Sequence, residues 1–62
     1  MKRNVGGFQI VSWIGDHNPP HVHVYESNKL VAKFNVRDKV FMFVVDGFAG
    51  RVTKALRKAK LL

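Results

Sequence analysis

Cysteine is absent from the 62 residues of this chain. Without thiols the protein has neither a disulfide framework nor a cysteine-ligated zinc site. A chain of this length forms one small domain, and it buries a smaller fraction of its surface than larger domains do, so its stability is marginal. Additional stability therefore has to come from a partner, a bound ion or self-association.

Acidic residues are scarce. Four Asp and Glu stand against 11 Lys and Arg, which gives a formal net charge of +7 at pH 7 and a pI near 10.4. On so small a surface this excess produces a strong positive field, which favours a polyanion: nucleic acid, an anionic membrane or an acidic partner protein. The alternative is a solvated surface whose charge only maintains solubility.

Long hydrophobic runs are also missing. No stretch approaches the ~20 consecutive apolar residues that span a bilayer. The basic start, Met1–Asn4, is followed by strand-like alternation from Phe8 instead of the apolar core of a signal peptide. We therefore expect a soluble bacterial protein of the cytoplasm that does not bind membranes.

The apolar pattern predicts four strands and then one helix. Alternating or continuous apolar sequence indicates strands over residues 8–14, 21–25, 30–36 and 40–45. After Asp46, which we expect to be the N-cap, the period changes to that of an amphipathic helix from Phe48 onwards. Because the links between strands are short, the pairing is antiparallel. The expected fold class is α+β: an antiparallel β-meander of about four strands packed against one C-terminal helix (β-β-β-β-α).

Two glycines and one apolar run define the expected organisation. Gly6 and Gly7 separate a flexible basic arm, residues 1–7, from a single small α+β domain over residues 8–62. The run Val40–Val45 is continuously apolar, which is typical of a strand that is covered on both faces. Either the core itself or a docked chain provides the second cover, and the partner is then a small protein or a second copy in a homodimer.

The expected helix is strongly basic. Its polar arc holds five positive charges and no acid: Arg51, Lys54, Arg57, Lys58 and Lys60. Cations near the C-terminus of a helix complement its dipole, but this effect does not account for Arg51 or Lys54. We predict that Arg51, Lys54, Arg57 and Lys58 bind nucleic acid.

All three histidines and both prolines lie in one segment, Asp16–Tyr25. The consecutive prolines at 19 and 20 exclude a helix and keep the chain extended. In the strand that follows, His21, His23 and Tyr25 alternate onto one face. The loop before it carries Asp16 and His17, so the sequence predicts a preorganised polar face at this point.

The run Asp16-His17-Asn18-Pro19-Pro20-His21-Val22-His23 resembles the signature of a family of small bacterial proteins, the domain of unknown function 4160 family. The similarity extends from Gly7 to about Val36 and weakens beyond it. The resemblance implies a role in two-gene, toxin–antitoxin-like modules, with a small partner protein encoded by the adjacent gene. It implies no particular biochemical activity.

Three roles for the histidine cluster stay open. In a metal site, His21 and His23, together with His17 or Asp16, bind a divalent ion such as zinc or manganese and leave a position for water. In metal-free RNA cleavage, His21 and His23 form an acid–base pair and Asp16 orients one imidazole. In a structural role, the histidines and Asp16 only tie the Pro-Pro loop to the sheet.

The hypothesis that we favour is a small, basic, toxin-like component of a toxin–antitoxin-type module. It binds RNA, in preference to DNA, and cleaves it with His21, His23 and Asp16. Lys33 or Arg51 neutralises the phosphate, and Tyr25 stacks against a base. The alternative is a non-enzymatic module that binds nucleic acid or a partner protein and whose histidines are structural.

Overall fold

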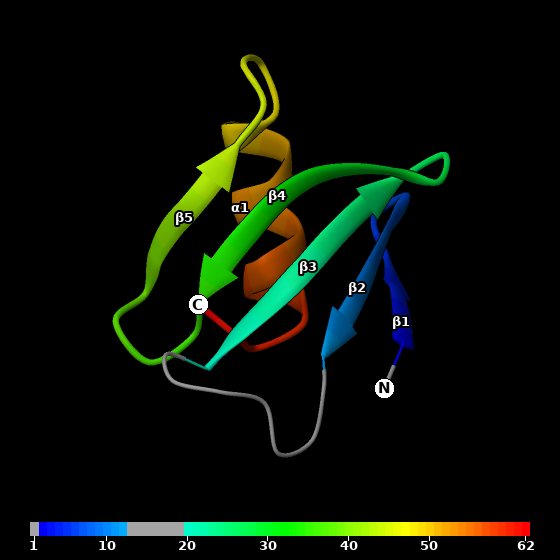
Figure 1. Cartoon of the computed structure of the whole chain (residues 1–62). Coiled ribbons are helices and arrows are strands. Elements are labelled where there is room, and N and C mark those ends of the chain that lie inside the picture. The colour runs from blue at the N-terminus through cyan, green and yellow to red at the C-terminus, as the bar shows by residue number, and fades with distance from the viewer. Residues whose placement is uncertain (1, 13–19) are drawn as a thin grey trace.

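Strand order in the sheet follows the order of the sequence. In the computed structural model, which describes residues 2–12 and 20–62, five antiparallel strands form one sheet in the order β1-β2-β3-β4-β5, and one helix follows (Figure 1). The elements are β1 (Lys2–Val5), β2 (Phe8–Ser12), β3 (His21–Glu26), β4 (Lys29–Asn35), β5 (Val40–Val44) and α1 (Ala49–Lys58). The α+β class and the meander that ends in one helix are confirmed, with five strands in place of about four.

The additional strand is β1, in the segment expected to be a flexible arm. It pairs antiparallel with β2 from Lys2↔Val11 to Val5↔Phe8. Gly6 and Gly7 form the two-residue turn between them, with φ of +55° and +82°. A type I′ hairpin turn needs positive φ at both central residues, and glycine adopts it without steric cost. The Gly-Gly pair therefore specifies β1, although the polar start of the chain shows no strand-like alternation.

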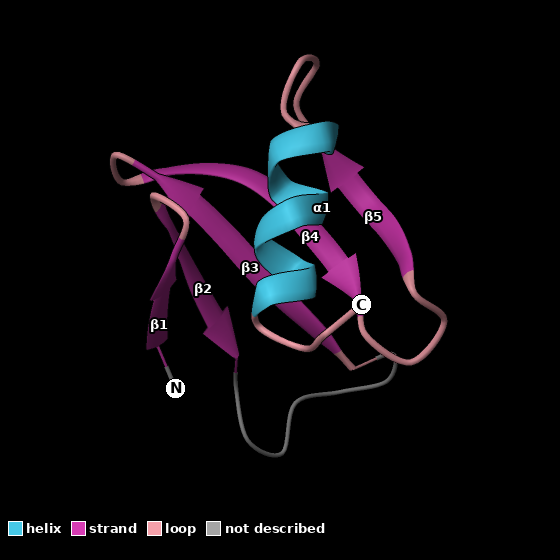
Figure 2. Cartoon of the chain, turned by 180° about the vertical axis from the view of Figure 1, so that it is seen from behind, coloured by secondary structure: helices cyan, strands magenta, loops and turns pink. Residues whose placement is uncertain are grey.

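Helix α1 packs on one face of the sheet only (Figure 2). The buried residues of the sheet in this core are Phe8, Ile10, Val22, Val24, Val31, Ala32 and Phe34. From the helix, Val52, Ala55, Leu56 and Ala59 are buried against them, as its apolar arc predicted. Among residues 2–12 and 20–62, no helix lies on the opposite face of the sheet.

Both ends of α1 differ from the expectation. Asp46 is not the N-cap: that position belongs to Phe48, which makes no side-chain hydrogen bond. The chain turns at Asp46-Gly47, where Gly47 has a φ of +87° and Phe48 N donates to Val45 O, so Asp46 lies before the helix. The helix ends at Lys58 because Lys60 adopts a φ of +63°, and Leu61 N donates to Leu56 O as in a Schellman motif.

Strand β5 is an edge strand, and within the described residues the core covers only one of its faces, so cover of the second face by a docked chain stays a prediction. Its side chains at Phe41 and Val44 pack against the core, while Val40, Met42 and Phe43 are 53%, 47% and 44% exposed. Between the pairs Lys33↔Phe43 and Phe34↔Phe41 the register shifts, which leaves Met42 as the extra residue of a bulge. A continuous apolar run does not distinguish a central strand from an unprotected edge.

A second bulge lies between Val24 and Tyr25 in the pairing of β3 with β4. It leaves Val31 as the extra residue of β4, and Val31 is 4% exposed, although strict alternation with the buried Ala32 would turn it toward solvent. The described part of the chain contains no helix with the length and apolar character needed to cross a bilayer.

Candidate functional site

The face of the sheet opposite α1 is called the open face here. It consists of the strand residues that alternate away from the helix. By register these are Lys2, Asn4, Gln9, Val11, His21, His23, Tyr25, Leu30, Lys33, Asn35, Val40 and Phe43. Among the described strand residues of this face, none is acidic.

One row of side chains crosses all five strands at the centre of the open face. The registers place Lys2 opposite Val11, Val11 opposite His23, His23 opposite Lys33, and Lys33 opposite Phe43. Directly opposed residues of neighbouring strands have Cβ atoms about 4.5–5.5 Å apart, so the members of this row are neighbours on the face. His23 thus lies at the centre of the sheet, with the cation Lys33 directly beside it.

The structure brings His21, His23 and Tyr25 together along β3. The imidazole centroids of His21 and His23 are 5.1 Å apart with an interplanar angle of 29°, which is a stacked pair. The ring of Tyr25 follows at 6.4 Å from His23, tilted by 54°. All three side chains are half-buried, so the period of the strand arranges three rings in a line that a ligand can reach.

Two of the predicted site residues, Asp16 and His17, lie outside the described residues. Within residues 2–12 and 20–62, no group of three or more His, Asp or Glu side chains is placed to hold a metal ion. The described part of the chain supplies two imidazoles, His21 and His23, where a zinc site needs three or four protein ligands. A divalent ion stays a prediction that depends on Asp16 or His17.

Asn35 organises the end of the sheet beside the histidines. It lies opposite His21, and only 5% of its surface is exposed. Its Oδ1 accepts hydrogen bonds from the backbone N–H groups of Arg37 and Asp38, both at 2.9 Å, and its Nδ2 donates to Asp38 Oδ2 at 3.2 Å. These bonds fix the connection to β5, so Asn35 has a structural role that alternation alone did not indicate.

The predicted cations of α1 lie on the other side of the molecule. Arg51 donates from Nη1 to Glu26 Oε2 at 3.0 Å. Its guanidinium also lies over the rings of Phe48, at 4.6 Å, and Phe8, at 5.5 Å. Arg51 therefore joins the start of the helix to the end of β3, and its charge is already matched by Glu26.

Lys54, Lys58 and Arg57 are the remaining predicted cations of the helix, and all are exposed. Lys54 and Lys58 line a small cleft of about 140 Å³ together with Gly6 and Phe8. Because α1 covers the face opposite His23 and Lys33, the predicted nucleic-acid-binding residues separate into two groups on opposite sides of the sheet.

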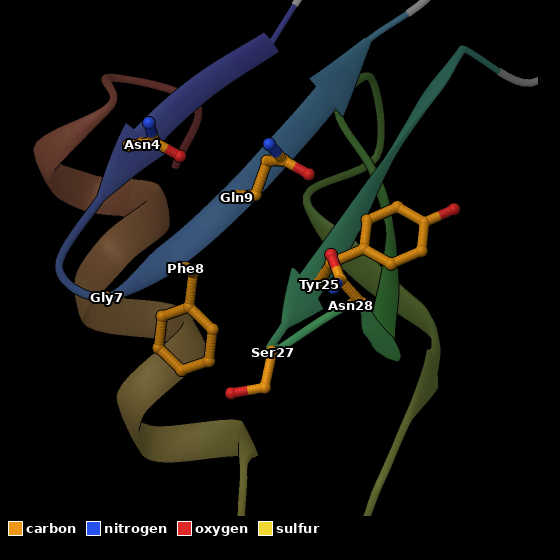
Figure 3. A pocket seen from close by; sticks show the side chains of 7 residues that line it. All are labelled: Asn4, Gly7, Phe8, Gln9, Tyr25, Ser27 and Asn28. Atoms are coloured by element: carbon orange, nitrogen blue, oxygen red, sulfur yellow. The ribbon is translucent and has the colours of Figure 1, made fainter.

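A pocket of about 270 Å³ lies at the end of the open face, between the two hairpin turns (Figure 3). Its lining residues are Asn4, Gly7, Phe8, Gln9, Tyr25, Ser27 and Asn28. A second hollow of about 230 Å³ shares Gln9, Tyr25 and Asn28 and continues to Lys2 and Val11. Sequence reasoning missed Asn4, Gln9 and Asn28, whose proximity depends on β1 and on the register of the turns.

The fold and the open face define a small α+β protein whose single antiparallel sheet is covered by a helix on one side. The sequence model of the family described as "Domain of unknown function (DUF4160)" matches residues 7–60, and the chain belongs to this family. The match includes the last strand and the helix, where the resemblance of the motif was weaker. Searches of curated proteins and of solved structures find no significant match.

Proposed function

We propose that this protein is a small basic component, toxin-like in role, of a bacterial toxin–antitoxin-type module in the cytoplasm. It binds single-stranded RNA on the open face and cleaves it beside the stacked histidines. The observation that carries this proposal is the central row of the sheet. Lys2, His23, Lys33 and Phe43 lie on the face opposite α1, and no acidic side chain lies among the described strand residues of that face.

Single-stranded RNA fits this combination of side chains. Its unstacked bases stack on aromatic rings, and its phosphates are attracted to a positively charged surface that follows the backbone. Tyr25 and His23 supply adjacent rings, and Phe43 supplies another that is 44% exposed. Lys33 lies directly opposite His23, and we expect its ammonium group to contact a phosphate of the bound RNA.

The histidine pair provides the groups that cleavage at a ribose requires. One imidazole removes the proton of a 2′-OH, whose oxygen attacks the adjacent phosphorus atom. The bond from phosphorus to the 5′-oxygen breaks, and the second imidazole donates a proton to that leaving oxygen. The products are a 2′,3′-cyclic phosphate and a 5′-OH. Lys33 neutralises the charge that develops on the phosphate.

The test is cleavage of a labelled single-stranded RNA by His21→Ala and His23→Ala variants. Removing a general acid or base lowers the rate by about 10²- to 10⁴-fold, and far-ultraviolet circular dichroism should show that the sheet is kept. Analysis of the RNA ends for cyclic phosphate identifies the reaction.

Cleavage by both histidine variants at the wild-type rate would contradict the enzymatic part of the proposal. If the wild-type protein binds RNA without cutting it, and the histidine variants only lower the Tm, the histidines are structural. The protein is then a binding module, which is the alternative that the sequence left open.

A second candidate function, binding of a partner protein, is favoured by the edge of β5. This edge has no neighbouring strand among the described residues, and Val40, Met42, Phe43 and Val45 leave 36–53% of their surfaces exposed. An apolar edge strand without proline or charge is a template for pairing with another strand. We propose that a strand of the small protein encoded by the adjacent gene pairs here, and that its acidic residues complement the charge of +7.

Co-expression with the protein encoded by the adjacent gene tests whether it pairs with β5. Light scattering measures the mass of the complex. Met42→Lys places a charge within β5 and should abolish the complex, while Lys60→Ala, after the helix, should preserve it. A complex that survives Met42→Lys contradicts docking at this edge. A dimer of this chain alone that Met42→Lys dissociates shows instead that a second copy occupies β5.

A further inference from the structure

The amide side chains between the hairpin turns have no part in the RNA-binding and cleavage mechanism described above. We propose that the pocket they line binds one nucleobase of the RNA, an adenine, which stacks on Tyr25 and is read by the amides of Gln9 and Asn28, with Asn4 beside them. This inference rests on the proposed binding of RNA to the open face, and it adds base selectivity to that surface.

The register of three strands places the amides in one row. Asn4 of β1 lies opposite Gln9 of β2, and Gln9 lies opposite Tyr25 of β3. The two-residue turns Gly6-Gly7 and Ser27-Asn28 then close the ends of these strands side by side. All four of their residues have positive φ, between 50° and 82°. Tight turns of this kind hold the row in a fixed position next to the ring of Tyr25.

The size of the pocket suits one base. Its volume of about 270 Å³ is below the roughly 300–1,000 Å³ of pockets that enclose a drug-sized ligand. Figure 3 shows the amide groups of Asn4 and Gln9 on neighbouring strands, with Tyr25 and Asn28 at the next strand and its turn. The adjoining hollow extends to Lys2, which places a cation where the phosphate of the bound nucleotide leaves the pocket.

The amides are available for a ligand. Within residues 2–12 and 20–62, no side-chain hydrogen bond engages Asn4, Gln9 or Asn28. Each amide offers a donor and an acceptor side by side, which matches the adjacent acceptor and donor on the edge of adenine. A π-face for stacking and an amide for the edge are the two requirements for reading a splayed-out base.

The pocket is separate from the histidines but belongs to the same strand. The ring of Tyr25 is 6.4 Å from that of His23, which is itself stacked on His21. A base on Tyr25 therefore directs its own backbone along β3 toward the imidazoles and Lys33. We infer that cleavage occurs next to the adenine that the pocket holds.

The experiment compares single-stranded RNAs of about eight nucleotides, containing only A, only C or only U, by fluorescence anisotropy at one salt concentration. The wild-type protein should bind the A oligomer about tenfold more tightly than the other two, as one bidentate amide contact provides. Adenosine monophosphate serves as a competitor that carries the base without the chain.

Three variants separate the contributions. Gln9→Met keeps the length of the side chain and removes the amide, so it should bring the A-to-U affinity ratio close to one. Asn28→Gly removes the second amide and still adopts the φ of +66° at this turn position, and it should lower the same ratio. Tyr25→Leu should weaken binding of all oligomers by roughly 5- to 100-fold, whereas Tyr25→Phe keeps the ring and serves as its control.

The binding results distinguish failure of the pocket from failure of the proposed function. Loss of the A preference in Gln9→Met and Asn28→Gly, with the Tm close to that of the wild type, supports the pocket. Equal binding of all three oligomers by the wild type, or a preference that both amide variants retain, overturns the pocket while RNA binding stands. Failure of every oligomer to bind overturns the proposed function and this inference together. Binding of adenosine monophosphate alone identifies a free nucleotide as the ligand and overturns the assignment to RNA.

Discussion

The two faces of the sheet use polar side chains in different ways. On the helix side, charged groups hold the fold together: Arg51 bonds Glu26 at 3.0 Å, and Arg3 Nη1 donates to Ala59 O at 3.1 Å. On the open face, the described amides of Gln9 and Asn4 have no side-chain hydrogen bond, and Lys33 lies beside a stacked pair of imidazoles.

This difference changes how the basic character of the chain is interpreted. The sequence concentrates five of its 11 Lys and Arg in and directly after the helix, but the charge of Arg51 is matched by Glu26 within the fold. The open face carries fewer cations, combined with rings and amides and without an acidic strand residue among those described. A surface that combines cations with stacking rings and amides is better suited to a nucleic acid than the exposed cations of the helix alone.

The largest expected effect compares the same substitution on the two faces. Val24, with 0% exposed, belongs to the core under α1, whereas Val11, with 6% exposed, lies on the open face outside that core. Val24→Ala should lower the free energy of unfolding by about 2–3 kcal/mol and Val11→Ala by about 1 kcal/mol, because only the first leaves a cavity between layers. Urea denaturation of the two variants measures the difference. Equal losses would mean that the open face is packed as tightly as the core.

The next effect is the loss of RNA affinity when two lysines are neutralised on one face or on the other. Lys2→Gln combined with Lys33→Gln should weaken RNA binding about tenfold and lower the salt slope by about 1.4, since each phosphate contact to single strands contributes about 0.7. Lys54→Gln combined with Lys58→Gln removes the same charge from the helix side and should change both quantities much less. Titrations at several salt concentrations make the comparison. A larger loss of RNA affinity in the helix variant would show that the RNA binds α1, as the sequence predicted.

The smallest effect compares two glycines. Gly7 has a φ of +82° in the turn of β1 and β2, so Gly7→Ala should cost about 1 kcal/mol. Gly50 lies exposed within α1, and a methyl group added to it would meet no atom within 4 Å, so Gly50→Ala should stabilise the fold by roughly 0.5–1 kcal/mol. Thermal unfolding should show a lower Tm for the first and a higher Tm for the second. An unchanged Tm in Gly7→Ala would show that β1 does not depend on this turn.

The sequence predicted the strands and the helix whose apolar residues recur with a regular period. Alternation located β3 and β4, and the helical period located α1 and its buried residues. It did not locate β1, because an edge strand whose residues are mostly exposed has no apolar face, and only the Gly-Gly turn indicates it. It also did not identify β5 as an edge, since a run of six apolar residues looks the same at the edge and in the centre.

For the site, the sequence predicted which residues of one strand share a face but not how neighbouring strands align. His21, His23 and Tyr25 share a face because residues of a strand alternate, and the motif makes this clear. The position of Lys33 opposite His23, and of Gln9 opposite Tyr25, depends on register between strands. Register is set by turns and by the bulge at Val24 and Tyr25, which no single strand encodes. The separation of Arg51 from the histidines likewise appears only once the helix is placed on its face.

Nuclear magnetic resonance tests most directly whether RNA lies on the open face. Backbone amide shifts are followed while a single-stranded RNA of about eight nucleotides is added to the full chain. If RNA lies on the open face, the largest changes should occur at Gln9, His23, Tyr25 and Lys33, with small changes along α1. Changes confined to Lys54, Arg57 and Lys58 would contradict binding on the open face and would place the nucleic acid on the helix.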